Sequence, residues 1–161
     1  LILKRMKRRH LSADILSFCA RIRALRPDAV FGADFIAGFP TETEVMAENT
    51  LRLINDAGIT YLHVFPYSVR PGTPAAKMPQ VDGKIIKARA ARLRQKGEAA
   101  LSAFLKTRIG TMSAVLMERS DMGRCEHFAP VHFDEPNETG AIVKARLTMA
   151  KNQILMGKVI L

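Results

Sequence analysis

The spacing of apolar side chains changes near Gly110 and divides the chain into two parts. Before that point, stretches with helical spacing alternate with short, continuous apolar runs, which predicts the order helix, strand, helix, strand, helix. The helices are expected at residues 12–25, 41–57 and 83–108, and the strands at residues 30–37 and 59–65. After Gly110, short segments separated by turn residues predict β-strands alone. We therefore expect an α/β part over residues 1–107 and a small all-β part over residues 108–161.

The ends of the predicted helices carry capping residues. Ser12 is expected to cap the first helix. Thr41 and Glu44 have the Thr-x-x-Glu spacing of a capping box at the start of the second helix, and Gly58 is expected to end it. Helices that alternate with buried strands indicate a parallel sheet, and such sheets bind ligands at the carboxyl ends of their strands.

Two loops with glycine and proline follow the two predicted strands, so both fall on that edge of the sheet. In the first, Gly38 lets another group approach the backbone closely, and Glu42 adds a carboxylate beside a helix N-terminus. The second offers the hydroxyls of Tyr67 and Ser68 and the planar cation of Arg70. Turn chemistry explains any one of these residues, but two such loops on one edge indicate a ligand site.

Two parallel strands do not make a stable sheet by themselves, because both are unprotected edges. We therefore expect the α/β part to be the second half of an α/β barrel, with the first half N-terminal to Leu1. The nearly continuous apolar run at residues 30–37 predicts a strand that is buried on both faces. Because part of the barrel is expected to be missing, we also expect exposed apolar surface along both strands.

Composition narrows the class of partner. The 161 residues carry 25 Lys and Arg against 15 Asp and Glu, a net charge of +10, which favours nucleic acid over a membrane surface. A basic but inert surface is the alternative. Cys19 and Cys125 lack any paired spacing, so they predict neither a disulfide nor a metal site and fit a reducing cytoplasm. No apolar run approaches the length that spans a membrane.

Four segments carry a resemblance to a known family: "LKRMKRR", "GADFIAGFPTETE", "LHVFPYSVRPGTPAAKMPQV" and "KARAARLRQKGEAAL". In this order and spacing they resemble the radical S-adenosylmethionine (SAM) methylthiotransferases that modify tRNA. The third segment is most similar to the branch that acts on threonylcarbamoyladenosine; near relatives act on isopentenyladenosine or on a ribosomal protein. The resemblance implies the C-terminal half of a radical SAM (β/α) barrel, followed by a TRAM-like β-barrel that binds RNA.

The resemblance also implies an activity. The family adds a methylthio group to C2 of a modified adenosine next to the anticodon, using SAM and two 4Fe-4S clusters. The family's C-x-x-x-C-x-x-C signature is absent from this sequence, and Cys19 and Cys125 match none of its ligand positions. We therefore expect this chain to hold neither cluster, to be inactive alone and to need the missing N-terminal part of the same protein. The alternative is a non-catalytic RNA-binding module.

The resemblance assigns site residues of the family to matching positions of this sequence. None of these positions is a catalytic residue or a metal ligand. The resemblance places these residues beside SAM: Arg8, Gly38, Phe39, Pro40 and Glu42. It places these beside the substrate base: Tyr67, Ser68 and Arg70. In the all-β part, cations and an aromatic ring predict a tRNA-binding surface, although each cation alone fits a solubilising charge. Its members are Arg119, Arg124, His127, Phe128, Lys144 and Arg146.

Overall fold

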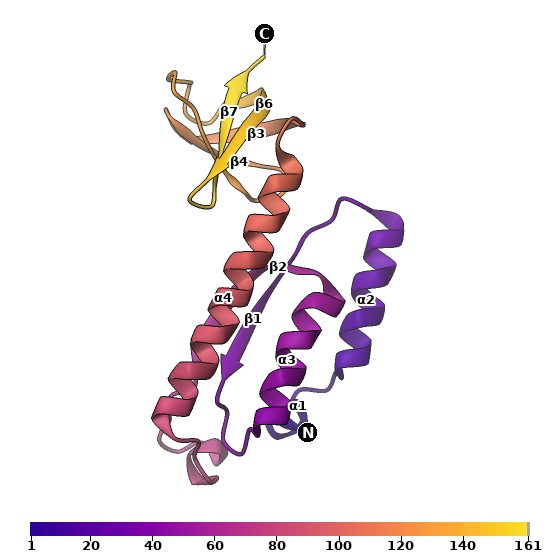
Figure 1. Cartoon of the computed structure of the whole chain (residues 1–161), viewed down its shortest axis with the longest axis vertical. Coiled ribbons are helices and arrows are strands. Elements are labelled where there is room, and N and C mark those ends of the chain that lie inside the picture. Colours follow the sequence, from indigo (N-terminus) through magenta and orange to yellow (C-terminus); the bar gives the residue numbers. More distant parts are fainter. Residues whose placement is uncertain (161) are drawn as a thin grey trace. The chain divides into compact units, whose positions relative to one another are not determined.

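A computed structural model of the chain describes residues 1–160 and divides them into two compact units, each with its own core (Figure 1). The first unit is residues 1–97 and the second begins at Glu98, so the division falls within the long helix α4 (Gly83–Arg108). It comes earlier in the chain than the boundary expected from the sequence, because Leu105, near the end of α4, belongs to the core of the second unit.

The first unit has the predicted order of helices and strands, together with two short helices, α1 (Ile2–Arg5) and the 3-10 helix η1 (Pro74–Lys77), that were not predicted. In chain order it contains α1, α2 (Ser12–Leu25), β1 (Phe31–Ala37), α3 (Glu44–Ala57), β2 (Ile59–Pro66), η1 and the first part of α4. β1 and β2 form a two-stranded parallel sheet. The core joins α2, α3 and α4 to this sheet through Cys19, Ala37, Ile54, Ala57, Ile59, Ala90 and Leu93. This sheet of two strands does not form a complete radical SAM barrel.

The start of α2 differs from the prediction. Leu11 is the N-cap residue, and Ser12 is already the first residue of the helix. The carboxylate of Asp14 accepts a hydrogen bond from the Leu11 N–H at 2.7 Å. This bond is the half of a capping box in which an acidic side chain of the first turn accepts from the N–H of the N-cap residue, and Leu11 makes no side-chain hydrogen bond that caps the helix.

The start of α3 also differs, and its end is confirmed. Thr43 rather than Thr41 caps the helix, and its hydroxyl accepts a hydrogen bond from the Met46 N–H at 3.3 Å. Thr41 lies two residues earlier in a tight turn, with a φ of 68°. Gly58 ends α3 in the left-handed conformation, with a φ of 59°.

The prediction that the first strand is buried on both faces is wrong for this structure. Along β1, exposed positions alternate with half-buried ones, and the exposed apolar side chains include Ile36, at 43%. On β2, Phe65 is 52% exposed. Burial on both faces requires further elements on the second face, and a sheet of two strands covered from one direction lacks them. The predicted exposure of apolar surface is confirmed.

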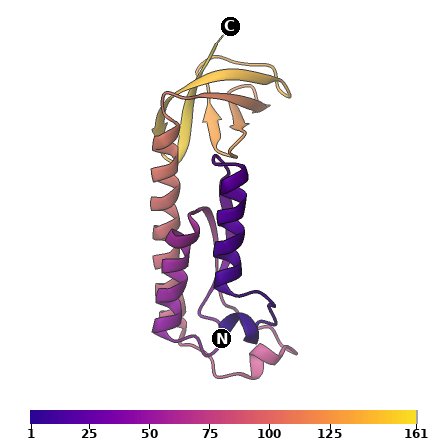
Figure 2. The same ribbon diagram turned by 90° about the vertical axis from the view of Figure 1, so that its right-hand side faces the viewer.

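The second unit contains the end of α4 and a closed five-stranded barrel with the strand order β3-β4-β5-β7-β6, and this barrel is the predicted all-β part (Figures 1 and 2). Its strands are β3 (Met112–Arg119), β4 (Met122–Cys125), β5 (Pro130–His132), β6 (Ile142–Lys151) and β7 (Ile154–Val159). Alternate side chains of β3 point into the core, where Val115 and Met117 are almost fully buried. No helix among residues 1–160 has the length and apolar character needed to cross a membrane.

Candidate functional site

The loops that follow β1 and β2 adjoin each other. Beyond the last strand pair, the Tyr67 N–H donates a hydrogen bond to the carbonyl of Ala37 at 2.8 Å. The rings of Phe39 and Tyr67 meet edge to face, with centroids 5.5 Å apart. The expectation that both loops share one edge of the sheet is confirmed. We call residues 38–42 together with residues 67–70 the strand-end rim.

Gly38 is needed at the rim for two reasons. Its φ of 74° lies in the left-handed region, which side chains other than glycine rarely adopt. A Cβ atom at this position would also lie 2.5 Å from Cγ1 of Ile86 on α4. The close approach that the sequence predicted at Gly38 is therefore made by a side chain of the protein itself.

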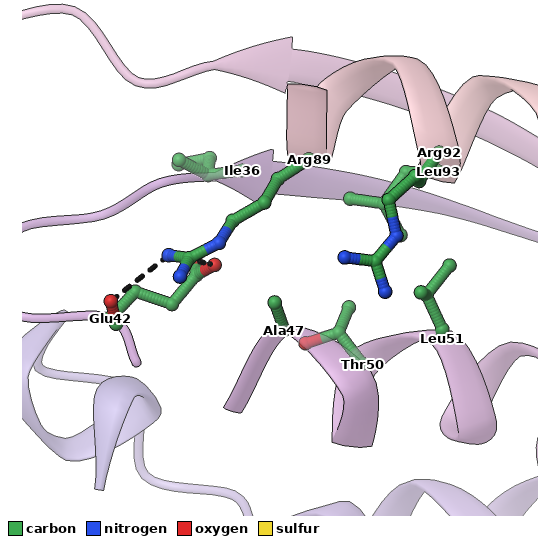
Figure 3. A pocket seen from close by; sticks show the side chains of 8 residues that line it. All are labelled: Ile36, Glu42, Ala47, Thr50, Leu51, Arg89, Arg92 and Leu93. Atoms are coloured by element: carbon green, nitrogen blue, oxygen red, sulfur yellow. Dashed lines mark hydrogen bonds and ion pairs between the residues drawn. The ribbon is translucent and has the colours of Figure 1, made fainter. Parts of the chain in front are cut away.

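Glu42 is buried and bonded within the protein. Its side chain is 8% exposed. One carboxylate oxygen accepts a hydrogen bond from the Gly38 N–H at 2.9 Å. The other accepts one from Nη1 of Arg89 at 3.1 Å, as Figure 3 shows. Both oxygens therefore already have partners inside the first unit, and the assignment of Glu42 to SAM stays a prediction.

Arg89 and Arg92 of α4 belong to an ion-pair network with α3. Arg89 binds Glu44 at 3.1 Å, and Arg92 binds both Glu44 and Glu48. The hydrogen bond from Arg92 holds the pKa of Glu44 below its ordinary value of 4.5, in opposition to desolvation. Carboxylates therefore neutralise both arginines, although each stands in a helix rich in Lys and Arg.

The same residues line a hollow between α3 and α4 (Figure 3). It is lined by Ile36, Glu42, Ala47, Thr50, Leu51, Arg89, Arg92 and Leu93. Figure 3 shows Arg89 reaching across this space toward Glu42. We therefore regard the hollow as a helix–helix junction that is held by charge pairs, and we look for the ligand site at the rim.

The remaining SAM-side residues differ in their surroundings. Phe39 is 7% exposed and Pro40 is fully buried, so both shape the rim from within. Arg8 is exposed. Within the basic run at residues 4–9, Arg5 of α1 contacts the rim and donates a hydrogen bond to the hydroxyl of Thr41. The sequence did not predict the contact of Arg5. In a run of neighbouring Lys and Arg residues, no local feature shows which side chain binds another part of the protein.

The substrate-side residues are more open. The side chains of Ser68 and Arg70 are exposed. The backbone carbonyl of Arg70 accepts a hydrogen bond from the hydroxyl of Thr73 at 2.8 Å, which closes the turn after β2. The Tyr67 hydroxyl is buried and has no hydrogen-bond partner among residues 1–160. A buried hydroxyl of this kind normally has a partner, so the rim retains an unused donor and acceptor.

The barrel carries three of the predicted RNA-binding cations on its outer surface. Residues directly opposite each other on paired strands share a face. Arg124 lies opposite Leu116 on β3, and Lys144 and Arg146 lie opposite other outward-facing residues of β3. All three cations are exposed. They therefore lie on one face of the β4-β3-β6 sheet, and we call them the cationic barrel face.

The other predicted RNA contacts lie at the end of β3 and in the turn between β4 and β5. Phe128 is 69% exposed, and the guanidinium of Arg124 lies 5.6 Å from its ring centroid. Arg124 also pairs with Glu118 at 3.0 Å, which reduces the charge it presents. His127 packs against Phe104 of α4, with ring centroids 5.8 Å apart. Arg119 is exposed at the end of β3.

A group of potential metal ligands that the sequence analysis did not predict lies in the turn after β4. Ligand atoms of Cys125, Glu126 and His127 all lie within 4.8 Å of one another. Cys125 is also part of the barrel core, and Glu126 accepts a hydrogen bond from the Ser113 hydroxyl at 2.5 Å. Adjacent residues in a strand point to opposite sides, so only the turn brings these three side chains together.

Curated proteins match the chain, whereas no protein-family model does. The chain is 53% identical over 147 residues to the threonylcarbamoyladenosine tRNA methylthiotransferase MtaB of Rickettsia prowazekii, which covers 91% of this chain and 35% of that protein. It is 37% identical over 164 residues to the tRNA-2-methylthio-N(6)-dimethylallyladenosine synthase of Cereibacter sphaeroides, which covers 98% of this chain and 38% of that protein. The synthase of Bartonella bacilliformis is 36% identical, with 98% and 36% covered.

These relatives define the class: the chain is homologous to tRNA methylthiotransferases and matches their C-terminal part. The family resemblance drawn from the sequence motifs is thereby confirmed. Of the two branches, the relative with 53% identity is the one named for threonylcarbamoyladenosine. The chain spans little more than a third of the length of these relatives.

Proposed function

We propose that this chain is the C-terminal part of a radical SAM enzyme that methylthiolates C2 of threonylcarbamoyladenosine next to the anticodon of tRNA, in the cytoplasm. One observation supports this above the others. The two loops with family motifs adjoin in one rim, with Phe39 against Tyr67, in a chain 53% identical to an enzyme named for this substrate. Most of the barrel and both clusters then belong to the N-terminal part of the whole protein.

The residues of the rim fit SAM and an adenine base. Gly38, Phe39 and Pro40 would line the SAM site from the rim, and the exposed Arg8 would be a further contact. The buried Tyr67 hydroxyl, which lacks a partner among residues 1–160, is available to the base, beside the exposed Ser68. SAM, when bound with the clusters, supplies the radical that acts on C2 and the methyl group.

The cysteines of this chain do not fit a cluster. A 4Fe-4S cluster needs several thiolates, and this chain has two cysteines, both buried, one in each unit. We therefore derive no step of the reaction from Cys19 or Cys125. Arg70 of the rim is exposed and carries a planar cation. It therefore suits an anionic or sulfur-containing group of the sulfur donor.

A chimera tests the proposed function. We expect a protein that joins the N-terminal part of the Rickettsia relative to this chain to restore methylthiolated threonylcarbamoyladenosine in tRNA of a strain that lacks it. Mass spectrometry of the tRNA nucleosides measures the product. A matched chimera that ends before β3 controls for the need for the barrel. A soluble chimera with both clusters and no product contradicts the proposal, and methylthiolated isopentenyladenosine instead assigns the chain to the other branch.

The cationic barrel face supports a second function, tRNA binding without catalysis. We expect the chain to bind tRNA with an affinity that falls as salt rises. Replacing Arg124, Lys144 and Arg146 by glutamine should reduce the slope of log affinity against log salt by about 2 to 3, because each phosphate contact contributes roughly one. Fluorescence anisotropy with labelled tRNA over a range of salt concentrations measures the slope.

The control for this test carries the same change of net charge elsewhere. Replacing the exposed cations Arg21, Arg52 and Lys84 of the first unit by glutamine should leave the slope nearly unchanged. Equal slopes for the two triple variants would remove the specific role of the barrel face. If the chain binds tRNA but the chimera is inactive, the two results together favour the non-catalytic function.

A further inference from the structure

We propose that Arg89 is a positioning residue for the strand-end rim: it fixes Glu42 and, through Glu42, the backbone of Gly38, so that the loop is shaped before SAM binds. The inference rests on the proposed function, because it takes the rim as the SAM side of the site. It concerns a residue of α4, outside both loops, and it gives α4 a role beyond packing.

The contacts of Arg89 make it a buried crosslink. The residue is 7% exposed. Its Nη1 donates to the backbone carbonyl of Glu42 at 2.9 Å and to the Glu42 carboxylate at 3.1 Å. Its Nε and Nη2 donate to one carboxylate oxygen of Glu44, at 3.2 and 3.1 Å. The planar guanidinium thereby holds the residues on both sides of Thr43, the cap of α3, in one fixed geometry.

The crosslink reaches Gly38 through Glu42, and a second residue of α4, Ile86, lies beside Gly38. The second carboxylate oxygen of Glu42 accepts the hydrogen bond from the Gly38 N–H at 2.9 Å. Ile86 lies three residues before Arg89 on α4, on the same helical face, and would clash with any Cβ at Gly38. The left-handed backbone of Gly38 is therefore held by a hydrogen bond that Arg89 supports and by the Ile86 side chain.

Neither lysine nor a neutral side chain reproduces this arrangement. A lysine keeps the charge but offers a single nitrogen, so it cannot bind the Glu42 carbonyl, the Glu42 carboxylate and Glu44 together. Glutamine removes the charge and leaves the Glu42 carboxylate, 8% exposed, without its cation. The Glu42 carboxylate is then free to turn away from Gly38, and the amide loses its acceptor.

Arg92 provides a matched control, one helical turn further along α4. It is also an arginine of the network, and it pairs with Glu44 and Glu48. Its side chain is 38% exposed, and neither of these partners belongs to the rim. Replacing Arg92 therefore weakens the junction of α3 and α4 and leaves the bond between Glu42 and Gly38 in place.

Amide hydrogen exchange in the 161-residue chain tests the structural half of the proposal. We expect Arg89→Gln to speed exchange of the Gly38 amide about tenfold or more, Arg89→Lys to have an intermediate effect, and Arg92→Gln to leave it unchanged. Slow thiol labelling of the buried Cys19 verifies that the first unit remains folded. Unchanged Gly38 exchange in a folded Arg89→Gln chain overturns the proposal, and if that variant unfolds, unchanged exchange in Arg89→Lys does so.

Steady-state kinetics of the chimera tests the functional half. We expect Arg89→Gln to raise the KM for SAM about tenfold while kcat changes less than about twofold, because the lost shape must be restored when SAM binds. Arg89→Lys should lie between, and Arg92→Gln should match the unmodified chimera. A fall in kcat with KM unchanged would overturn the positioning role. An inactive unmodified chimera would instead refute the proposed function, and Gly38 exchange would still decide whether Arg89 fixes the loop.

Discussion

Replacement of Gly38 by alanine is expected to destabilise the first unit by about 3 kcal/mol. The φ of 74° costs a residue with a Cβ about 1–2 kcal/mol. The contact at 2.5 Å with Ile86 adds about 1–3 kcal/mol, because the helix side chain must move. Thiol labelling of Cys19, buried at 3% exposure in α2, reports opening of this unit. Its rate should rise about a hundredfold, since 1.4 kcal/mol corresponds to a factor of ten.

Two controls separate the clash from the backbone strain. Gly72 has a φ of 80°, but a Cβ there would meet nothing within 4 Å, so Gly72→Ala should cost only about 1–2 kcal/mol. Cys125 lies in the second unit and should label at an unchanged rate in both variants. Equal costs for Gly38→Ala and Gly72→Ala would show that Ile86 does not constrain the rim.

The second large effect is expected in the barrel. Leu155 of β7 is 0% exposed and packs in the core of the second unit. Leu155→Ala removes buried methyl groups and leaves a cavity, which costs about 2–5 kcal/mol. Labelling of Cys125, which is 4% exposed in the same core, should therefore become faster by a factor of about 30 to several thousand.

The matched control is Leu116→Ala on β3. Leu116 is 48% exposed on the outside of the barrel, so the same change should alter the free energy of unfolding by about 0.5 kcal/mol or less. Cys19 in the first unit should be unaffected by either substitution. If both leucines proved equally important for protecting Cys125, the inside and outside of the barrel would have been assigned wrongly.

Local patterns were sufficient for the elements and for the family. The bounds of α4 agree with the prediction, because its apolar spacing continues without interruption to the glycine after it. Gly58 was identified correctly because its left-handed conformation is favoured by glycine irrespective of the rest of the fold. The start of α3 was not, because Thr41 and Thr43 both precede a plausible first turn. The turn at Thr41, where its N–H bonds the carbonyl of Pro79 at 3.1 Å, decides between them.

Local sequence patterns did not show which side chains interact with each other. Arg89 stands in a run of cations and has the sequence character of a solvent-exposed residue, yet it is buried against Glu42, 47 residues away. Glu42 lies in the loop after β1, as the sequence indicated, but its partners Arg89 and Gly38 were not predicted. Cys125, Glu126 and His127 were adjacent from the start, and only the turn after β4 shows that their ligand atoms converge.

The sequence by itself determined the order of helices and strands, the change from α/β to β, and the relationship to tRNA methylthiotransferases. These depend on spacing, caps and motifs, which act over a few residues. Only the tertiary structure decided which charges are paired, which group fills the space beside Gly38 and which hydroxyl at the rim lacks a partner. Those outcomes depend on contacts between residues far apart in the chain, and the fold alone sets their distances and their exclusion from water.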